Sequence, residues 1–160
     1  MSFLASTNLV AYHQSLLQDR ERMGAYRRAV HEVVRPGDVV LDLGAGSGAL
    51  SLFACQAGAR RVYAIESGDA IELAREMSRR HGLQDRIVLV NERSYRARID
   101  EPVDVIVTEY GAAELQGKTV HQRGQALAAI AHPDFRDELM EAADRTSGGR
   151  PPFRIETDER

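Results

Sequence analysis

The first two thirds of the chain alternate short apolar runs with segments of helical periodicity. Four runs rich in β-branched residues predict buried strands of a parallel sheet, at residues 39–43, 61–65, 87–90 and 103–107. Two segments between them predict helices that end at glycines, at residues 49–57 before Gly58 and at residues 69–81 before Gly82, the second with Asp69 as its cap. The order strand, helix, strand, helix, strand, strand is typical of an α/β fold.

Both ends of the chain are expected to add helices to this sheet. Residues 11–34 predict an amphipathic helix, whereas residues 1–10 have no clear pattern. Residues 119–130 suit another helix, and Pro133 suits the first turn of a last one that reaches about residue 143. The predicted organisation is therefore a sheet domain followed by a helical segment and a mobile tail rich in Gly, Pro and charge, at residues 1–110, 111–145 and 146–160.

The fourth predicted strand has no clear successor, since after residue 107 only residues 153–155 have strand character. The sheet is therefore expected to end there, with unpaired backbone groups along an apolar edge. An exposed edge of this kind invites association. The sequence accordingly predicts a homo-oligomer, or a fold in which residues 112–143 cross the edge.

The stretch VVLDLGAGSGAL, residues 39–50, joins the first strand to three glycines at alternate positions, Gly44, Gly46 and Gly48. Glycines take positive φ and let a ligand approach the backbone, so bulk at these positions is expected to hinder a nucleotide-like guest. The spacing also fits the dinucleotide pattern. Asp42 favours S-adenosylmethionine over NAD, because a carboxylate near the loop repels a pyrophosphate and attracts an ammonium or sulfonium group. A glycine-rich turn that binds nothing is the alternative.

An acidic residue follows the second strand at the distance expected of a ribose ligand. Glu66 lies 18 positions after Gly48 (66 − 48). A carboxylate about 20 residues beyond such a loop is placed to accept hydrogen bonds from ribose hydroxyls. The alternative for Glu66 is an exposed carboxylate at the end of a strand.

Composition and charge narrow the class of protein. The 160 residues, of which 43% are hydrophobic, suffice for one domain with its own core. A net charge of -3 gives no basic footprint, so a nucleic-acid partner is not expected. The single cysteine, Cys55, has no histidine or second cysteine nearby and is expected to be a buried structural thiol, with no metal site. No run suits a signal peptide or membrane span, and a cytoplasmic location is the default expectation.

The stretch from about Tyr12 to Val107 resembles the cofactor-binding half of the protein arginine methyltransferase family. The motifs that carry the resemblance are LLQDRERMGAYRRAV, VVLDLGAGSGALSLFACQAGARRVYAIE and VDVIV. It implies a Rossmann-like methyltransferase sheet that binds S-adenosylmethionine. By this resemblance Arg22 pairs with the cofactor's carboxylate, Glu66 holds the ribose and Ser94 lies beside the adenine. Asp42 and Gly44 belong to the methionine-side loop. Pattern alone instead favours a solvated basic face for Arg22.

The same resemblance implies catalysis by two glutamates on the loop after the fourth strand, which hold and polarise a guanidinium. Glu109 matches the first glutamate by position. The second is expected near Lys118, but the next glutamate is Glu114, only five residues on (114 − 109). The substrate clamp is therefore not intact. Glu109 is the candidate base or orienter, with a solvated carboxylate as its alternative, and the chain is either a methyltransferase or a protein that binds the cofactor without catalysis.

Residues 103–143 carry a second resemblance, to the C-terminal part of the acetyl-CoA hydrolase/transferase family. Its specific pieces are TEYGAAELQGK and AIAHPDFRDEL. No residue here matches the glutamate that forms the acyl intermediate in that family. The alternatives to a methyltransferase are thus a fragment related to the CoA family and a non-catalytic interaction protein. No motif names the methyl acceptor, which is either a small molecule or a protein.

Overall fold

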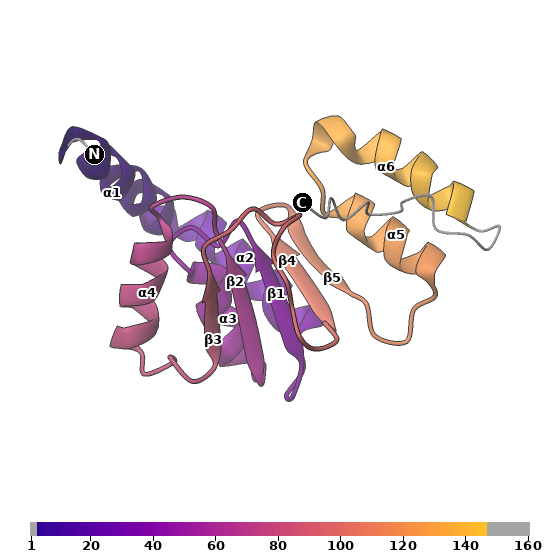
Figure 1. Cartoon of the computed structure of the whole chain (residues 1–160), viewed down its shortest axis with the longest axis horizontal. Helices are drawn as coiled ribbons and strands as arrows, with labels where there is room; N and C mark the ends of the chain where they lie inside the picture. Colours follow the sequence, from indigo (N-terminus) through magenta and orange to yellow (C-terminus); the bar gives the residue numbers. More distant parts are fainter. Residues whose placement is uncertain (1–2, 147–160) are drawn as a thin grey trace, which may run out of the picture.

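The computed structural model describes residues 3–146, which fold around a five-stranded sheet (Figure 1). The strand order is β3-β2-β1-β4-β5, and the strands are β1 (Val39–Leu43), β2 (Arg61–Ile65), β3 (Ile87–Val90), β4 (Val105–Thr108) and β5 (Gly111–Glu114). The first four are parallel, and β5 is antiparallel to β4. The mixed α/β fold class is confirmed, and the four predicted strands lie within two residues of their predicted positions.

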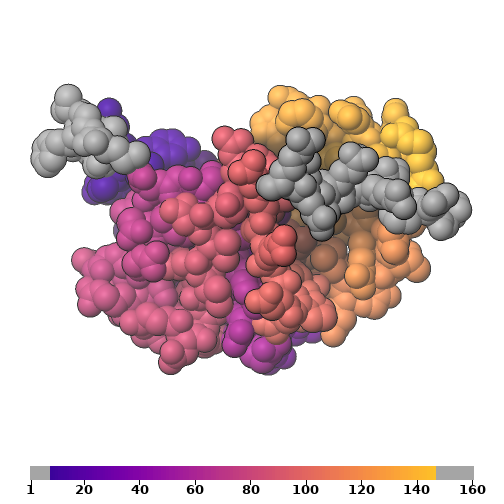
Figure 2. All heavy atoms as spheres, in the orientation of Figure 1, coloured from indigo at the N-terminus to yellow at the C-terminus, as the bar shows by residue number. Residues whose placement is uncertain are grey.

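Six helices flank the sheet in the described residues: α1 (Phe3–Gln18), α2 (Arg20–Val33), α3 (Ala49–Ala57), α4 (Ile71–Arg80), α5 (Val120–Ala129) and α6 (Pro133–Arg145). Helices α2 and α3 pack on each other behind the sheet, and α4 lies beside β3 (Figure 1). Helices α5 and α6 pack together beyond β5, where they form a separate lobe in the space-filling view (Figure 2). The described residues contain no helix that is both long and apolar enough to cross a membrane.

Local capping explains where several helices begin. The Asp19 side chain accepts a hydrogen bond from the Arg22 N–H, so it starts a new helix inside the predicted segment 11–34 and divides it into α1 and α2. Helix α1 begins at Phe3, where no pattern was expected. Helix α4 is capped at Ala70 without a side-chain bond, so the predicted cap at Asp69 is wrong. The predicted tail lies outside the described residues apart from Thr146.

Strand β5 overturns the prediction that the sheet ends after the fourth strand. It pairs with β4 over the register Val105↔Glu114 to Thr108↔Gly111, while β1 pairs with the other side of β4. The sequence GAAE lacks β-branched and aromatic residues, which is why it carried no strand signal. Strand β4 is therefore interior, and a segment that overlaps the predicted range 112–143 covers the edge.

The core has two parts, one on each face of the sheet. Along β4, Val105 and Val107 belong to the cluster under α2 and α3, whereas Ile106 belongs to the cluster with Leu115 and Ile130, as the alternation of a strand requires. Cys55 is a buried, free thiol in the first cluster, as predicted. Burial raises its pKa, so the thiol is kept protonated and unreactive.

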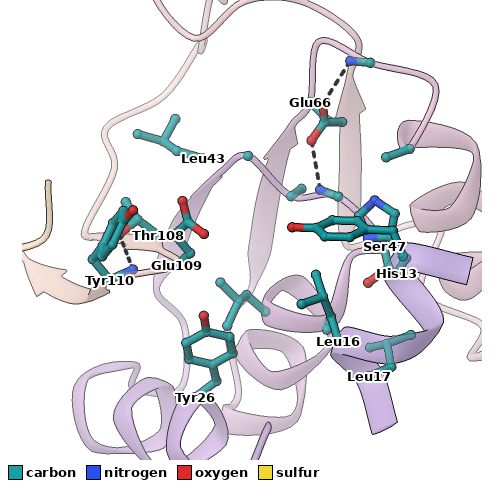
Figure 3. Close-up of a pocket in the computed structure, with 18 of the residues that line it drawn as sticks. His13, Leu16, Leu17, Tyr26, Leu43, Ser47, Glu66, Thr108, Glu109 and Tyr110 are labelled. Carbon is teal, nitrogen blue, oxygen red and sulfur yellow. Dashed lines mark hydrogen bonds between the residues drawn. The ribbon is translucent and has the colours of Figure 1, made fainter. Parts of the chain in front are cut away.

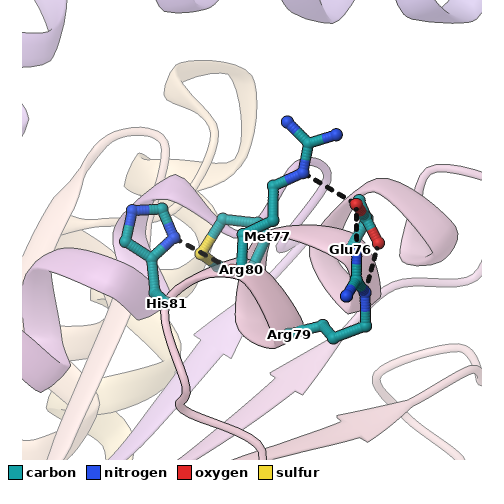
Figure 4. Close-up of polar contacts among 5 residues, drawn as sticks. All are labelled: Glu76, Met77, Arg79, Arg80 and His81. Carbon is teal, nitrogen blue, oxygen red and sulfur yellow. Dashed lines mark hydrogen bonds and ion pairs between the residues drawn. The ribbon is translucent and has the colours of Figure 1, made fainter.

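Helix α4 has a charged outer face and an apolar inner face. Figure 4 shows the polar contacts of the outer face. On the outer face Glu76 accepts hydrogen bonds from Arg79 at 2.8 Å and from Arg80 at 2.7 Å, and these bonds lower its pKa to about 2. His81 Nδ1 lies 3.0 Å from the Met77 carbonyl oxygen at the end of the helix. The inner face brings Ala74 and Met77 against the turn after β1, which fixes the position of that turn.

Candidate functional site

A cavity of about 520 Å³ lies at the carboxyl ends of the strands. Ligands of open α/β sheets bind at this edge, and small-molecule pockets measure about 300–1,000 Å³. Its walls are α1, the start of α2, the glycine loop (residues 44–48) apart from Gly48, the β2–α4 loop, the β4–β5 turn and the α5–α6 turn. In Figure 3, Glu66 and His13 lie at one end of the cavity, while Glu109 and Tyr110 lie at the other.

The three glycines of the loop have different roles. Gly44 has φ +74° and lines the cavity, and a Cβ built there has no atom within 4 Å, so the backbone is open to a ligand. Gly46 also lines the cavity, but a Cβ there would lie 2.8 Å from His13 Cε1. Gly46 thus lets α1 pack across the loop.

Gly48 does not line the cavity, so the expectation that bulk there would hinder a ligand stays a prediction. Its φ is +81°, and a Cβ would come within 2.6 Å of Met77 Cε and 3.1 Å of Ala74 Cβ. Gly48 is required for close packing of the loop on α4, which is the role of the last glycine in many nucleotide-binding turns.

Asp42 lies behind the loop rather than in the cavity wall. Its side chain is fully buried, and one oxygen accepts a hydrogen bond of 2.6 Å from Ser51 Oγ, while the other has no partner in the described residues. Burial raises the pKa of Asp42 to about 6, although the Ser51 bond opposes that shift. Asp42 is therefore not part of the cavity lining, and the expectation that its charge favours a cationic ligand stays a prediction.

The Glu66 carboxylate closes the loop from the cavity side. One oxygen accepts the Gly46 N–H at 3.1 Å and the other accepts the Gly68 N–H at 2.8 Å (Figure 3). Three further loop amides are used inside the protein, since those of Gly44 and Ala45 donate to the Ile65 carbonyl at 2.9 Å and that of Gly48 donates to the Ala45 carbonyl at 2.7 Å. A pyrophosphate needs free amides and no nearby anion. The loop therefore offers carboxylate oxygens to donors of a ligand, such as hydroxyl groups, instead of amides to a phosphate.

Arg22, on the first turn of α2, is the arginine of the cavity wall. Its Nε donates to Tyr26 Oη at 3.0 Å, and its guanidinium lies 5.3 Å from the Tyr26 ring centroid. Its Nη2 is 3.8 Å from a Glu109 carboxylate oxygen, and the bond to Tyr26 together with this charge raises the pKa of Arg22. Arg22 is thus a fixed cation with free donors on the cavity side.

The β4–β5 turn places Glu109 in the cavity wall, with a side chain that is 61% exposed. Glu114 points elsewhere: it forms ion pairs with Lys118 at 3.3 Å and Arg35 at 3.6 Å, and it does not line the cavity. The two carboxylates of a guanidinium clamp are therefore not brought together. Ser94 is exposed in the β3–β4 connection and also lies outside the cavity lining.

Three further lining residues were not found from the sequence. His13 lies in the predicted helical segment 11–34 but had no motif to mark it, and Tyr110 and His132 come from turns that only the tertiary structure joins. Thr108 makes that junction: its Oγ1 donates to the Ile130 carbonyl at 2.7 Å and accepts the Tyr110 N–H at 3.0 Å. For His132, the sequence offered one signal: the predicted helix boundary at residues 130–133 places this histidine between two helices.

The family model of the acetyl-CoA hydrolase/transferase C-terminal domain matches residues 56–143. The chain belongs to this family. The match runs from the end of α3 through α6, so it includes the β4–β5 turn and the α5–α6 turn of the cavity wall. The second resemblance of the sequence is confirmed.

Curated relatives confirm the first resemblance, to the protein arginine methyltransferases. Probable protein arginine N-methyltransferase 6 of Arabidopsis thaliana is 41% identical over 103 residues, 63% of this chain and 24% of that protein. Protein arginine N-methyltransferase PRMT10 of Oryza sativa subsp. japonica is 42% identical over 102 residues, 62% of this chain and 27% of that protein. The chain thus spans about a quarter of the length of these two relatives.

Solved structures confirm the fold. Arabidopsis thaliana protein arginine methyltransferase 10 superimposes with a TM-score of 0.58 at 38% identity, over 62% of this chain and 29% of that chain. The PRMT1 enzyme-prozyme heterotetrameric complex of Trypanosoma brucei with AdoHcy gives a TM-score of 0.59 at 29% identity, over 74% and 36%. The five-stranded sheet of this chain is therefore a Rossmann-like sheet of the S-adenosylmethionine-dependent methyltransferase type. The cytoplasmic location and the domain boundaries stay predictions.

Proposed function

We propose that this protein binds S-adenosylmethionine in the cavity and functions as an arginine-methyltransferase-like methyltransferase. The observation that carries the proposal is the pair of hydrogen bonds from Gly46 and Gly68 to the Glu66 carboxylate. They hold a carboxylate beside the glycine loop, at the position where an acidic residue after the second strand accepts ribose hydroxyls, and its charge repels a phosphate placed at the Gly46 amide. A ligand without phosphates, with ribose hydroxyls to donate, suits this arrangement.

The charges along the cavity support the same ligand. S-adenosylmethionine carries a sulfonium, an ammonium and a carboxylate, and the lining offers the carboxylates of Glu66 and Asp69 together with the guanidinium of Arg22, 3.8 Å from Glu109. Arg22 would pair with the carboxylate, because its planar donors match that group in a bidentate fork. Glu66 would accept the ribose hydroxyls, and the open backbone at Gly44 would allow close approach of the ligand.

When bound, S-adenosylmethionine supplies a methyl group activated on a sulfonium sulfur. The chain then has to orient the acceptor and exclude water, which suffices for much of the rate enhancement in a transfer of this kind. Apolar side chains of α1, among them Leu9, Leu16 and Leu17, line the cavity and would help to exclude water around a bound ligand. Glu109, within 3.8 Å of Arg22, would orient the acceptor or take its proton.

A CoA-derived ligand is the second candidate, and the match to the acetyl-CoA hydrolase/transferase C-terminal domain favours it. The Glu66 carboxylate opposes it at this loop, since an anion 3.1 Å from the Gly46 amide repels phosphate. A protein that binds a partner without catalysis is the third reading, and it requires no ligand in the cavity.

Calorimetric titration with S-adenosylmethionine, NAD and acetyl-CoA separates these readings. We expect heat of binding with S-adenosylmethionine and none with NAD or acetyl-CoA. Binding of acetyl-CoA alone would support the second candidate, and the absence of binding by all three ligands would support the interaction protein. Methyl transfer is tested separately, with a radiolabelled methyl group and an acceptor panel that includes arginine peptides and small aromatic compounds.

Self-association also belongs to the proposal. The Trypanosoma brucei neighbour is a heterotetramer, and in the described part of this chain the outer edges of β3 and β5 have no strand partner. We propose that a homo-oligomer forms through one of these edges. Light scattering that gives the mass of a monomer at micromolar concentration would contradict it.

A further inference from the structure

The end of the cavity opposite Glu66 is built by two turns, the β4–β5 turn with Glu109 and Tyr110 and the α5–α6 turn with His132 (Figure 3). We propose that this end binds a small, uncharged, planar aromatic compound, and that an N–H or O–H group of this compound is the methyl acceptor. The inference rests on the proposed function, because it names the acceptor class for the same cavity.

Aromatic side chains dominate this end. The rings of Tyr110 and His132 meet edge to face, with centroids 5.3 Å apart and an interplanar angle of 81°. Phe135 lies on the outer side of His132, with centroids 5.9 Å apart at 57°. Edge-to-face packing fixes both rings and adds an apolar, planar surface beside Ile130. The wall therefore has the shape and polarity that a flat aromatic ligand requires.

The charges at this end disfavour a cationic acceptor such as a guanidinium. The guanidinium of Arg136 lies 5.6 Å from the centroid of the Tyr110 ring, so one cation already occupies that ring's neighbourhood. Arg22 is a second cation at this end, since its Nη2 lies 3.8 Å from a carboxylate oxygen of Glu109. The second carboxylate of a clamp is missing, because Glu114 is paired with Lys118 and Arg35 outside the cavity lining. A cationic acceptor would thus meet the guanidinium of Arg22 in the lining and that of Arg136 beside the Tyr110 ring, while Glu109 is already paired with Arg22 and Asp134 lies 3.5 Å from His132 outside the lining.

Two polar groups of the lining can contact the methyl-accepting compound, one as a hydrogen-bond acceptor and the other as a hydrogen-bond donor. Glu109 is an anionic hydrogen-bond acceptor. His132 Nδ1 accepts the Asp134 N–H at 3.2 Å, so in the neutral imidazole the proton resides on Nε2, which is then a donor. His132 acts as a positioning residue. In the transfer, the bond between sulfur and the methyl carbon breaks, a bond from that carbon to the acceptor N or O forms, the sulfur leaves as a neutral thioether, and the acceptor proton passes to Glu109.

The test uses the full chain labelled with ¹⁵N and saturated with S-adenosylhomocysteine. The probes are benzimidazole as an uncharged planar ring with an N–H, cyclohexanol as a neutral ring that is not planar, and Nα-acetyl-arginine amide as a cation. We expect benzimidazole to shift the amide resonances of Tyr110 and Ala131, and the other two probes to leave them unchanged at the same concentration. Tighter binding of the arginine amide than of benzimidazole would overturn the proposal.

Two variants connect that binding to the aromatic wall. His132→Asn removes the ring but keeps a side-chain acceptor for the cap of α6, and Tyr110→Leu keeps an apolar side chain. Each is expected to weaken benzimidazole binding by about tenfold, in line with the energy of an aromatic contact. Tyr95→Leu is the control, because Tyr95 is 68% exposed and lies outside the cavity lining. Benzimidazole affinities unchanged in both wall variants would overturn the proposal.

A titration with S-adenosylhomocysteine distinguishes the failure of this inference from the failure of the proposed function. Binding of S-adenosylhomocysteine without binding of benzimidazole overturns the aromatic acceptor alone. Absence of S-adenosylhomocysteine binding overturns the proposed function and the acceptor assignment with it, whether or not benzimidazole binds.

Discussion

Glu66 accepts the backbone N–H of Gly46 across a distance of 3.1 Å, although 20 residues separate the two in the sequence. The contact joins the end of β2 to the loop after β1, and it holds a carboxylate where an acidic residue after the second strand accepts hydrogen bonds from ribose hydroxyls. A second bond, from the Gly68 N–H at 2.8 Å, fixes the other oxygen. The choice of ligand for this cavity depends on that single carboxylate.

Replacement of Glu66 tests its contact with the ligand. Hydrogen bonds to a charged group contribute about 1.5–3 kcal/mol, so Glu66→Ala is expected to weaken S-adenosylmethionine binding by roughly tenfold or more. Titration calorimetry measures the change. Glu76→Gln is the control, because Glu76 lies on the solvated face of α4 and outside the cavity lining. Equal affinities of the parent and Glu66→Ala would remove Glu66 from the binding site.

Arg22 is predicted to bind a carboxylate in a way that lysine cannot reproduce. The planar guanidinium presents paired donors, whereas an ammonium group is a point charge. Arg22→Lys should therefore bind S-adenosylmethionine less tightly, and Arg27→Lys, at an exposed position of the same helix outside the cavity lining, should bind it as the parent does. If both variants retain the affinity of the parent, Arg22 belongs to a solvated basic face.

Variants at Gly44 and Gly48 distinguish two roles of the glycine loop, access of the ligand to the backbone at Gly44 and packing on α4 at Gly48. Gly48→Ala is expected to destabilise the fold by on the order of 1–3 kcal/mol, because a strained φ of +81° is combined with a contact of 2.6 Å to Met77. Gly44→Ala has the strain of a φ of +74° without a clash, so it should lose less stability and more ligand affinity. Urea unfolding and titration calorimetry measure both effects. A larger loss of stability for Gly44→Ala would contradict the assignment.

Asp42 should make the stability depend on pH between about 4 and 6. Burial raises its pKa from 3.8 to about 6, so the folded state binds the proton more tightly than the unfolded state. The stabilisation from this proton is complete below pH 4 and is lost as the pH rises through 6. The loss amounts to on the order of 3 kcal/mol.

The measurement is urea unfolding of the parent and of Asp42→Asn at pH 4 and pH 7. Asparagine does not ionise, so the free energy of unfolding of the parent, relative to that of this variant, should be lower at pH 7 than at pH 4. A difference between parent and variant that is the same at both pH values would show that Asp42 does not titrate in this range.

Hydrogen exchange tests the position of β4 in the sheet. Since β1 and β5 pair with its two sides, the amides of Val105 and Ile106 are expected to exchange slowly, near the rate of global unfolding. Rapid exchange at both amides would mean that β4 is an open edge, as the sequence alone suggested.

The parallel part of the fold is predictable from the sequence because buried strands need β-branched runs and their helices end at glycines such as Gly58. Strand β5 is not, because GAAE gains its strand conformation from pairing with β4 rather than from propensity. Gly44, Glu66 and Glu109 do meet in one cavity, since loops after parallel strands share an edge, and the first turn of α2 adds Arg22 to it.

The remaining site residues depended on tertiary packing. Asp42 was expected in the site, but side chains alternate along β1 and its own points under the loop toward Ser51. His132 was not expected there, because only the bond from Thr108 to Ile130 brings the α5–α6 turn to the cavity. Neither relationship has a signature at a fixed spacing in the sequence.

A crystal structure of the full chain with S-adenosylhomocysteine tests the central claim most directly. The account predicts electron density in the cavity, with the ribose hydroxyls within hydrogen-bond distance of the Glu66 carboxylate and the ligand carboxylate paired with Arg22. Density at any other place on the protein, or a ligand whose ribose makes no contact with Glu66, would contradict it.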